Sequence, residues 1–515
     1  MSVPLATLLE GIPSAELVRG DSLVEISSIQ HDSRLVDVGD LFVAIPGYNT
    51  DGHNFLLNAI DAGAVALVVQ RDSRSFWAHL PGTYPIVVVD NTRLCLASLA
   101  ANFFDNPSKD LMVIGVTGTD GKTTTTHFLT KIFEQAGYTV GRLGTVDSYI
   151  TNVDLGNFSS TRLTTPEATQ VQEFLRKMVN AGCSYAIIES SSHGLSLSRL
   201  DNLAFDTAVL TNVSGDHLDF HKTFEAYREA KGKLFQKLEA APEPIAIVNA
   251  VDPSAHFFLD LASAARSISY AVGSEVSEEV DISAKIKDLR PDGSTFQIAF
   301  PEKDVECSIQ IPASFNVENA LAAAATAYAH GIGIDEIVAG LAACSGIPGR
   351  MEYINAGQDF DVVVDYAHTG DAVRKVLSVL RDVTKGKLIV VAGAAGERDP
   401  GRRFGVARAA AEIADFAIFT NEDPRSENPE QIVREIGNHA EGAGKTRGKD
   451  FLEISDRRFA IARAMEYAET DDLVVVCGKG HEHSIELDNQ FFPWDDREVV
   501  KEEIVRLAKK REDPS

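Results

Sequence analysis

Residues 111–124, LMVIGVTGTDGKTT, decide the fold of this chain of 515 residues. An apolar run of strand type ends in a loop of glycine and threonine, and a helix-like segment, THFLTKIFEQAG, occupies residues 126–137. A second apolar run, TVGRLGTV, follows at residues 139–146. Strand, loop, helix and strand in this order form a βαβ unit, which predicts a parallel sheet in an α/β fold.

The loop of this unit has the residue types of a phosphate-binding loop. Backbone N–H groups of a glycine-rich turn and of a helix N-terminus can surround phosphate oxygens. Lys122 can neutralise terminal phosphates, and the Thr123 hydroxyl can ligate Mg²⁺. Val116 stands where the generic GxxxxGK[ST] motif has its first glycine, so a plain Gly/Thr turn is the alternative. The strand–loop–helix context favours a nucleotide phosphate site.

The length of the chain predicts about three domains rather than one. The apolar strands DLFVAI, AVALVV and PIVVVD predict a small α/β domain over residues 1–108. A central domain, residues 109–345, adds YAIIES, TAVLTNV and PIAIVN to the βαβ unit. Beyond the Gly/Pro break SGIPGRME, residues 346–515 contain DVVVDYAH, KLIVVAGA, DFAIFTNED and DLVVVCGKG. These four runs predict buried parallel strands in a second doubly wound domain.

Charge and cysteine content exclude several classes of protein. Lys and Arg number 48 and Asp and Glu number 75, so the net charge of −27 disfavours nucleic acid as a partner. The five cysteines lie far apart with no CxxC pair, which fits a reducing cytoplasm and neither a disulfide framework nor a zinc site. We expect no signal peptide and no membrane span, because no basic N-terminal region and no run of about 18 apolar residues occurs.

Two side chains are expected at the carboxyl ends of central strands, beside the phosphate loop. Glu189 ends YAIIES, and His217 follows TAVLTNV. A carboxylate and an imidazole can complete Mg²⁺ shells that Thr123 and phosphates begin. Taken singly, each has an ordinary alternative: a strand-end glutamate is often a solvated rim residue, and a histidine in GDHLDFH could be a hydrogen-bonded core residue.

The order and spacing of eight motifs resemble the Mur ligase family over residues 30–500. The motifs are GTDGKTT (118–124), TTPEA (164–168), ESSSHGL (189–195), NVSGDHLDFH (212–221), YREAK (227–231), FNVENALAA (315–323), IPGRME (347–352) and DYAHT (365–369). The resemblance implies an N-terminal UDP-binding domain, a central P-loop-type ATPase domain with a mostly parallel sheet, and a C-terminal Rossmann-like domain that binds an amino acid.

Further segments resemble the branch of the family that adds the third residue of the peptidoglycan stem peptide. These segments are DSRLVDVGDLFVAIPGYNTDGHNF (32–55), GERD (396–399), EDPRSENP (422–429) and GKGHE (478–482). The resemblance implies ATP-driven formation of an acyl phosphate on the γ-carboxylate of D-glutamate in UDP-MurNAc-L-Ala-D-Glu, followed by attack of an amine. A carboxylate is a poor electrophile, so phosphoryl transfer must first give it a leaving group.

The resemblance also implies two Mg²⁺ ions. Thr123 and Glu189 would hold the first, and His217 and a carbamylated Lys231 would hold the second. Lys122, His217 and Lys231 are the implied catalytic residues. An ammonium repels Mg²⁺, whereas a carbamate on Lys231 would add a pair of anionic oxygens. The ordinary alternative for Lys231 is a lysine on a helix surface.

The substrate-binding residues are carried over motif by motif. For ATP the resemblance gives Gly118, Thr119, Asp120, Gly121, Lys122, Thr123, Thr124, Asn316, Asn319, Arg350 and Asp365. For UDP-MurNAc-dipeptide it gives Ser33, Tyr48, Asn49, Thr50, Thr164, Thr165, Ser191 and Arg199. A guanidinium such as that of Arg199 can bind phosphate or carboxylate oxygens in a bidentate manner. Asn316 could instead cap the alanine-rich helix that follows it.

For the incoming amino acid the resemblance gives Arg398, Glu422, Asp423, Pro424, Arg425, Gly478 and Glu482. Arg425 favours meso-diaminopimelate, because it can pair with the distal carboxylate that lysine lacks. Asp423 replaces the neutral Asn of the DNPR pattern of diaminopimelate-adding enzymes. It could suit the ammonium of lysine or ornithine, or it could pair with Arg425. We favour meso-diaminopimelate and keep L-lysine and L-ornithine as alternatives.

Two more distant readings remain. Folylpolyglutamate synthase shares the phosphate loop and the glutamate-ligating domain, but the N-terminal domain argues against it. A non-catalytic ATP-binding homologue would be expected to lack at least one of Lys122, Thr123, Glu189, His217 and Lys231, all of which are present. We expect a cytoplasmic monomer whose partners are small molecules.

Overall fold

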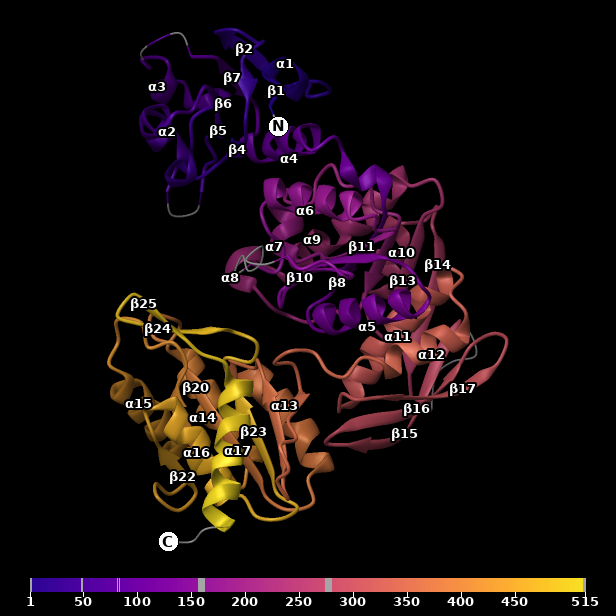
Figure 1. Cartoon of the computed structure of the whole chain (residues 1–515), viewed down its shortest axis with the longest axis vertical. Coiled ribbons are helices and arrows are strands. Elements are labelled where there is room, and N and C mark those ends of the chain that lie inside the picture. The colour runs from indigo at the N-terminus through magenta and orange to yellow at the C-terminus, as the bar shows by residue number, and fades with distance from the viewer. Residues whose placement is uncertain are drawn as a thin grey trace. The chain divides into compact units, whose positions relative to one another are not determined.

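The computed structural model describes residues 2–47, 50–80, 82, 84–155, 163–273 and 280–512. They form an α/β fold (Figure 1). The chain divides into two compact units, Met1–Ala271 with Ala322–Ile337, and Val272–Leu321 with Val338–Ser515. Among the helices of these described residues, none combines the length and the apolar content needed to cross a membrane.

The first unit opens with a five-stranded sheet in the order β2-β7-β6-β5-β4. Its elements are β2 (Glu16–Arg19), β4 (Ile29–Gln30), β5 (Leu41–Val43), β6 (Ala66–Gln70), β7 (Ile86–Val89), α2 (Leu56–Ala62), α3 (Arg74–Trp77) and α4 (Thr92–Phe103), preceded by β1 (Val3–Pro4), α1 (Leu5–Leu8) and β3 (Glu25–Ile26). Side chains alternate between the sheet faces, so Val68 packs in the cluster that includes α4 and Leu67 in the one that includes α2. All three strands predicted for this region are confirmed.

A second sheet of the first unit has the order β10-β9-β11-β8-β12-β13-β14, and all its strands but β10 run parallel. The strands are β8 (Met112–Thr117), β9 (Val140–Leu143), β10 (Ser148–Ile150), β11 (Tyr185–Glu189), β12 (Thr207–Leu210), β13 (Ile245–Asn249) and β14 (Arg266–Val272). The helices are α5 (Lys122–Gln135), α6 (Ala168–Asn180), α7 (Ser192–Ser196), α8 (Leu218–His221), α9 (Phe224–Gln236) and α10 (Ala255–Leu261). The predicted βαβ unit is therefore β8, α5 and β9.

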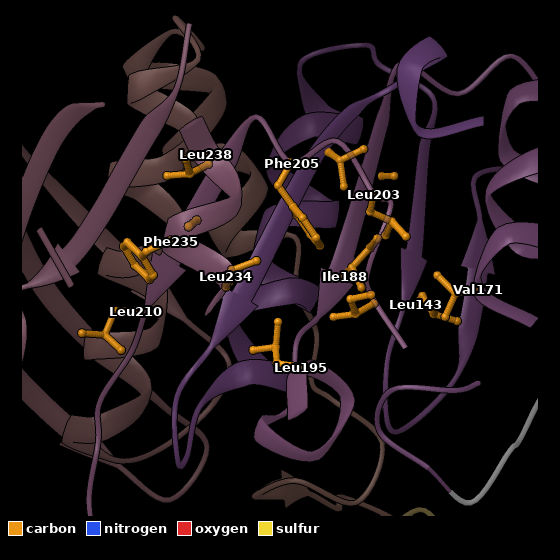
Figure 2. Close-up of a cluster of buried hydrophobic side chains, with 14 of the residues drawn as sticks. Leu143, Val171, Ile188, Leu195, Leu203, Phe205, Leu210, Leu234, Phe235 and Leu238 are labelled. Atoms are coloured by element: carbon orange, nitrogen blue, oxygen red, sulfur yellow. The ribbon is translucent and has the colours of Figure 1, made fainter. Parts of the chain in front are cut away.

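The helix α9, which contains Lys231, packs against this sheet through apolar side chains. Phe205, Leu234 and Phe235 pack together with the strand residue Ile188 (Figure 2). Gly115 on β8 permits the close approach, because a Cβ there would lie 2.6 Å from Leu234 Cδ1. The buried cluster thus fixes the position of α9 beside the strand that leads into the phosphate loop.

The second unit contains an antiparallel meander and a six-stranded sheet. The meander is β15 (Ile282–Arg290), β16 (Gly293–Ala299) and β17 (Asp304–Ile309). The helices α11 (Ser314–Ala329) and α12 (Ile334–Ala342) follow it in the chain, and their residues from Ala322 to Ile337 belong to the first unit. The sheet has the order β18-β19-β23-β20-β21-β22, with β18 (Glu352–Tyr353), β19 (Asp361–Asp365), β20 (Leu388–Ala394), β21 (Phe416–Asn421), β22 (Phe451–Glu453) and β23 (Leu473–Cys477). The sequence did not predict the meander.

The four parallel strands predicted near the C-terminus are confirmed as β19, β20, β21 and β23. The helices are α13 (Gly370–Val383), α14 (Gly401–Ile413), α15 (Pro429–Gly442), α16 (Arg457–Tyr467) and α17 (Asp496–Glu512), and the hairpin β24 (Ser484–Leu487) and β25 (Gln490–Pro493) precedes α17. Residues from α16 and α17 pack on one face of the sheet. Parallel strands end at the same edge, so Asp365, Asn421 and Cys477 share one rim of the sheet.

Candidate active site

The phosphate loop is held in one shape by its neighbours. Gly118 has φ +154°, and a Cβ there would lie 1.9 Å from Thr211 Oγ1, so only glycine fits. The N–H of Thr119 donates to the carbonyl of Asn212 at 2.8 Å, and the Thr211 hydroxyl donates to the carbonyl of Asp120 at 2.6 Å. Gly121, with φ +86°, begins α5 as its N-cap. These hydrogen bonds and backbone angles give the loop a defined shape.

Lys122 is the first residue of α5 and turns back onto this loop. Its Nζ donates to the carbonyls of Gly118 and Thr119, each at 2.9 Å. The next two residues, Thr123 and Thr124, are buried in the first turn of the helix. A lysine ammonium above exposed N–H groups at a helix N-terminus is suited to hold phosphate oxygens.

Glu189 is 1% exposed at the end of β11, which rules out a solvated rim residue. Its Oε2 accepts hydrogen bonds from the Thr123 hydroxyl at 3.0 Å and from the Thr145 hydroxyl at 2.9 Å. Its Oε1 accepts from the Thr145 N–H at 3.0 Å. A buried carboxylate beside a threonine hydroxyl at the phosphate loop is an oxygen-donor set of the kind that Mg²⁺ prefers.

Lys231 is 1% exposed on α9, so it is not a surface lysine. Its Nζ donates to the Gly118 carbonyl at 2.6 Å and lies 4.4 Å from the centre of the Tyr227 ring. Burial, and then the nearby charge of Lys122, hold the pKa of Lys231 well below the ordinary value for lysine. A lysine with a low pKa is in part an uncharged amine, and an uncharged amine can react with CO₂ to form a carbamate.

His217 lies at the start of α8 with φ +52°, and its side chain is 49% exposed, so it is not a core histidine. Its ring centre lies 4.8 Å from that of His193 and 6.3 Å from that of Tyr227. Burial, and then the charge of His217, lower the pKa of His193 to about 4. The Tyr227 hydroxyl lies 3.1 Å from Thr119 Oγ1. His217 and Lys231 therefore both border Tyr227, beside the phosphate loop.

The residues expected to bind UDP-MurNAc-dipeptide fall into two groups. Thr164, Thr165, Ser191 and Arg199 lie together near Glu189. Ser33 lies in the short 3₁₀ helix Ser33–Leu35, and Thr50 is exposed. Tyr48 and Asn49 lie outside the described residues.

The first of these groups is organised around Thr165. Its hydroxyl donates to the Glu189 carbonyl at 2.8 Å and accepts from the Ser191 hydroxyl at 2.9 Å. Arg199 donates to the Thr165 carbonyl at 3.0 Å and forms an ion pair with Glu167 at 2.7 Å. Glu167 was missed, although it lies within the TTPEA motif, because a glutamate in a turn gives no signal of its own.

Asn316 does not cap the alanine-rich helix, and that alternative was wrong. It lies inside the first turn of α11, and its Nδ2 donates to the Pro312 carbonyl at 2.7 Å. A cap would instead accept a hydrogen bond from a backbone N–H. Its Oδ1 accepts from Asn319 Nδ2 at 3.2 Å, so the two asparagines form a buried pair.

Asp365 and Arg350 lie together in the second unit. Asp365 accepts hydrogen bonds from the N–H groups of Met351 and Ala367, both at 2.8 Å, while burial raises the pKa of its carboxyl. The Arg350 guanidinium lies 4.7 Å from the centre of the Tyr366 ring. The backbone at Gly349 also packs directly against the backbone at Gly480. A Cβ at Gly349, where φ is +62°, would lie 2.1 Å from the carbonyl carbon of Gly480.

Asp423 pairs with a lysine that the sequence analysis did not consider. Lys479 Nζ lies 2.7 Å from Asp423 Oδ1 and 2.6 Å from Glu482 Oε2, and the lysine side chain is 2% exposed. The suggested pairing of Asp423 with Arg425 was therefore wrong. Asp423 thus shares the ammonium of Lys479 with Glu482, and the only signal for this in the sequence was the lysine of GKGHE.

Arg425 instead lies beside Glu486. Its Nε is 3.4 Å from Glu486 Oε2 and has no hydrogen-bond partner, although the side chain is only 15% exposed. The backbone of Arg425 has φ +54°, and its N–H donates to the Glu486 carbonyl at 2.9 Å. Burial and the charge of Arg425 lower the pKa of Arg398. The two guanidinium groups are thus close enough to repel each other, and a carboxylate bound between them would be stabilised by both charges.

Glu422 is buried beside Gly478. Burial raises the pKa of Glu422 to about 8, and its Oε1 has no hydrogen-bond partner. Gly478 packs against it, since a Cβ at this position, where φ is +123°, would lie 2.7 Å from Glu422 Oε1. Pro424 connects Asp423 to Arg425 and donates no hydrogen bond of its own.

Three family models match the chain. They are described as "Mur ligase family, catalytic domain" at residues 25–104, "Mur ligase middle domain" at residues 116–327, and "Mur ligase, glutamate ligase domain" at residues 349–480. Together they match regions of the chain that include the phosphate loop, Glu189, Lys231 and the Glu422–Arg425 segment.

Full-length relatives resemble the chain throughout. UDP-N-acetylmuramyl-tripeptide synthetase of Roseiflexus sp. (strain RS-1) is 42% identical and covers 94% of this chain and 95% of its own length. UDP-N-acetylmuramoyl-L-alanyl-D-glutamate–2,6-diaminopimelate ligase of Bacillus licheniformis is 37% identical and covers 98% and 99%. A solved structure of a ligase with this second name superimposes with a TM-score of 0.66 at 29% identity, covering 99% of this chain and 100% of its own.

Proposed function

The chain belongs to the Mur ligase family, and we propose that it is the ATP-dependent UDP-N-acetylmuramyl-tripeptide synthetase of peptidoglycan synthesis. It would join a diamino acid, with meso-diaminopimelate favoured, to UDP-MurNAc-L-Ala-D-Glu. The observation that carries the proposal is the meeting of the phosphate-loop residues Lys122 and Thr123 with the buried Glu189 and Lys231. The match of residues 25–104 to a Mur ligase model speaks against a folylpolyglutamate synthase.

In this proposal, Lys122 and the backbone N–H groups of the phosphate loop bind the phosphates of ATP. We assign the nucleotide to Gly118–Thr124, with Asn316, Asn319, Arg350 and Asp365 as further contacts. Phosphoryl transfer requires mainly positioning and neutralisation of charge. A lysine on a preformed loop supplies both. Transfer of the γ-phosphoryl group to the substrate carboxylate would give an acyl phosphate, which the amine of the incoming amino acid then attacks with loss of phosphate.

We propose that two Mg²⁺ ions bind here and, when bound, neutralise charge on the phosphates. Thr123 Oγ1 and Glu189 Oε2, 3.0 Å apart, are oxygen ligands for the first. For the second we propose His217 and a carbamate on Lys231. Carbamylation needs a deprotonated amine, which burial favours because it lowers the pKa of Lys231. We infer domain boundaries near residues 108 and 345. We assign the binding of UDP-MurNAc-dipeptide to Ser33, Tyr48, Asn49, Thr50, Thr164, Thr165, Ser191 and Arg199.

The contacts of Arg425 favour meso-diaminopimelate as the third residue. Because Asp423 is paired with Lys479, it does not neutralise Arg425. Arg425 Nε makes no hydrogen bond to Glu486 Oε2, which lies 3.4 Å away, so a substrate carboxylate would compete for the guanidinium with this longer ion pair. With Arg398 nearby, the region presents two cations to an anionic group. Lysine or ornithine would leave this pair without a substrate carboxylate to bind.

The test is release of ADP and phosphate by the purified chain with ATP, Mg²⁺ and UDP-MurNAc-L-Ala-D-Glu, adding meso-diaminopimelate, L-lysine and L-ornithine in separate reactions. We expect release that depends on both the nucleotide sugar and an amino acid, with diaminopimelate giving the highest kcat/KM. Mass spectrometry of the product identifies the added residue. No release with any of the three amino acids would refute the ligase assignment, while faster release with lysine would refute the specificity alone.

A further inference from the structure

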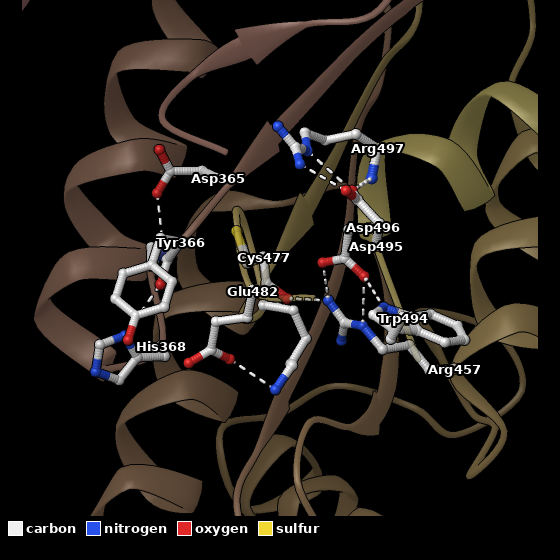
Figure 3. Close-up of polar contacts among 12 residues, drawn as sticks. Asp365, Tyr366, His368, Arg457, Cys477, Glu482, Trp494, Asp495, Asp496 and Arg497 are labelled. Carbon is white, nitrogen blue, oxygen red and sulfur yellow. Dashed lines mark hydrogen bonds and ion pairs between the residues drawn. The ribbon is translucent and has the colours of Figure 1, made fainter. Parts of the chain in front are cut away.

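A buried ion pair lies beneath the amino-acid region and takes no part in the chemistry proposed above. Arg457 begins α16 and Asp496 begins α17, and their side chains are 1% and 0% exposed. Arg457 Nε lies 2.8 Å from Asp496 Oδ1, and Arg457 Nη2 lies 2.6 Å from Oδ2 (Figure 3). Trp494 Nε1 also donates to Asp496 Oδ1 at 2.8 Å. Asp496 therefore fixes the plane of the guanidinium.

The same guanidinium donates to the ends of two strands. Nη1 donates to the carbonyl of Asn421 at 3.1 Å, and Nη2 donates to the carbonyl of Cys477 at 2.8 Å. Asn421 is the last residue of β21, and Cys477 is the last residue of β23. These strands are not neighbours, because β20 lies between them in the sheet. Arg457 therefore connects two strand ends that the backbone ladder does not join directly.

The two strand ends lead directly into the two arms of the amino-acid region. We call residues 422–425 the first arm and residues 478–482 the second arm. The first arm begins immediately after Asn421 and the second immediately after Cys477. The arms meet again where Lys479 pairs with Asp423. Their separation is therefore set at the strand ends by Arg457 and farther along by Lys479.

We propose that Arg457, oriented by Asp496, is a positioning residue for amino-acid binding, since it sets the separation of the two arms. This inference rests on the proposed function, which assigns both arms to the incoming amino acid. Arg457 acts through backbone carbonyls and contacts no substrate. Its planar fork of five N–H donors serves a bidentate carboxylate and two carbonyls at once. A lysine keeps the charge but cannot maintain this geometry.

Stability alone does not require a charged pair at this place. Replacing both members of a buried ion pair by apolar residues of similar size is often neutral or stabilising, whereas removing one member leaves a buried charge unpaired. The double variant Arg457→Met/Asp496→Leu therefore leaves no buried charge unpaired. It does remove the partners of the Asn421 and Cys477 carbonyls and of Trp494 Nε1, which lowers stability, so its Tm is measured beside its KM values. It lacks the two donors to the strand-end carbonyls, so the arms lose their fixed separation.

The adjacent residue provides a matched control. Arg458 also connects α16 to α17, through ion pairs with Glu502 and with Glu503, the latter at 3.0 Å. Within the described part of the chain it bonds to neither strand end, and its side chain is 47% exposed. Arg458→Met therefore removes a link between the same two helices while leaving the Asn421 and Cys477 carbonyls bound to Arg457.

The experiment measures KM for each of the three substrates, kcat and Tm in Arg457→Lys, Arg457→Met/Asp496→Leu and Arg458→Met. We expect the KM for the amino acid to rise by about tenfold or more in both Arg457 variants, because small misplacements of binding groups are costly. The KM for ATP and for UDP-MurNAc-dipeptide should change less than about twofold, and Arg458→Met should match the wild type. If the well-folded double variant retains the wild-type KM for the amino acid, or if all three KM values rise equally, the proposal is wrong.

Amide hydrogen exchange tests the positioning role without any turnover. The N–H of Gly478 donates to the Asp365 carbonyl, that of Glu482 to the Lys479 carbonyl, and that of Gly396 to the Asp423 carbonyl. These amides should exchange faster in both Arg457 variants and at the wild-type rate in Arg458→Met. If these three amides exchange at the wild-type rate in folded Arg457 variants, the positioning role is wrong. Absence of ligase activity in the wild type with faster exchange in the variants would instead refute the assignment of the arms.

Discussion

Arg425→Ala is expected to abolish a preference for meso-diaminopimelate over lysine. The Arg425 side chain is 15% exposed and that of Glu486 is 16% exposed, so a charge-assisted bond formed here is poorly screened by water. Such a bond contributes about 1.5 to 3 kcal/mol. Arg425 Nε gives up no hydrogen bond in forming it. The preference therefore amounts to about tenfold to a hundredfold in kcat/KM, at about 1.4 kcal/mol per factor of ten.

The assay is a competition of diaminopimelate, lysine and ornithine in one reaction, with the products separated by mass. Glu486→Gln is the matched control, because it keeps the shape of the side chain and removes the charge that competes for Arg425. We expect it to increase the preference for diaminopimelate. If the wild type adds lysine or ornithine at least as fast as diaminopimelate, and Arg425→Ala leaves that order unchanged, the reasoning is refuted.

Three further predictions concern Lys122 of the phosphate loop, the buried Lys231 and the buried Glu422. Lys122→Ala should lower ADP formation by about a hundredfold or more at an unchanged Tm, and a variant that retains most of its turnover would contradict the loop assignment. Lys231→Ala should be nearly inactive and partly rescued by a short carboxylic acid. An unmodified Lys231 in a fully active, CO₂-depleted enzyme would contradict the carbamate. Burial raises the pKa of Glu422 from an ordinary 4.5 to about 8, so the folded chain retains a proton that the unfolded chain releases. The stability that protonated Glu422 contributes is therefore lost as pH rises from about 4.5 to about 8. Glu422→Gln should flatten the dependence of the free energy of unfolding on pH, measured by denaturant titration.

The parallel sheets could be predicted because their strands are buried on both faces. Continuous apolar runs such as those of β8, β11, β20 and β23 have few alternatives once turn residues bound them. The meander of β15, β16 and β17 was missed because its strands alternate apolar and charged residues over only part of their length. Lys285, Lys287 and Asp288, for instance, lie in one strand and interrupt an apolar pattern.

The candidate site was predictable where chemistry lies at a strand end or in a glycine loop. Thr123 and Glu189 meet as expected because neighbouring parallel strands end at the same edge. Partners brought together by tertiary packing gave no local signal. Lys479 and Asp423 are 56 residues apart, and Arg457 and Asp496 are 39 apart. A sequence pattern shows that such residues are charged, but it does not show which carboxylate each cation binds.

The backbone contact between Gly349 and Gly480 has a consequence for redesigning substrate choice. Each glycine has a positive φ, and a side chain at Gly349 would collide with the peptide that joins Gly480 to His481. A mutant library directed at the second arm can therefore vary His481 and Glu482. Positions 349 and 480 should be held constant, and so should Lys479, whose buried ion pair with Asp423 joins the two arms. Diversity introduced at either glycine would be spent on chains with a displaced backbone, in which a new amino-acid preference could not be separated from misfolding.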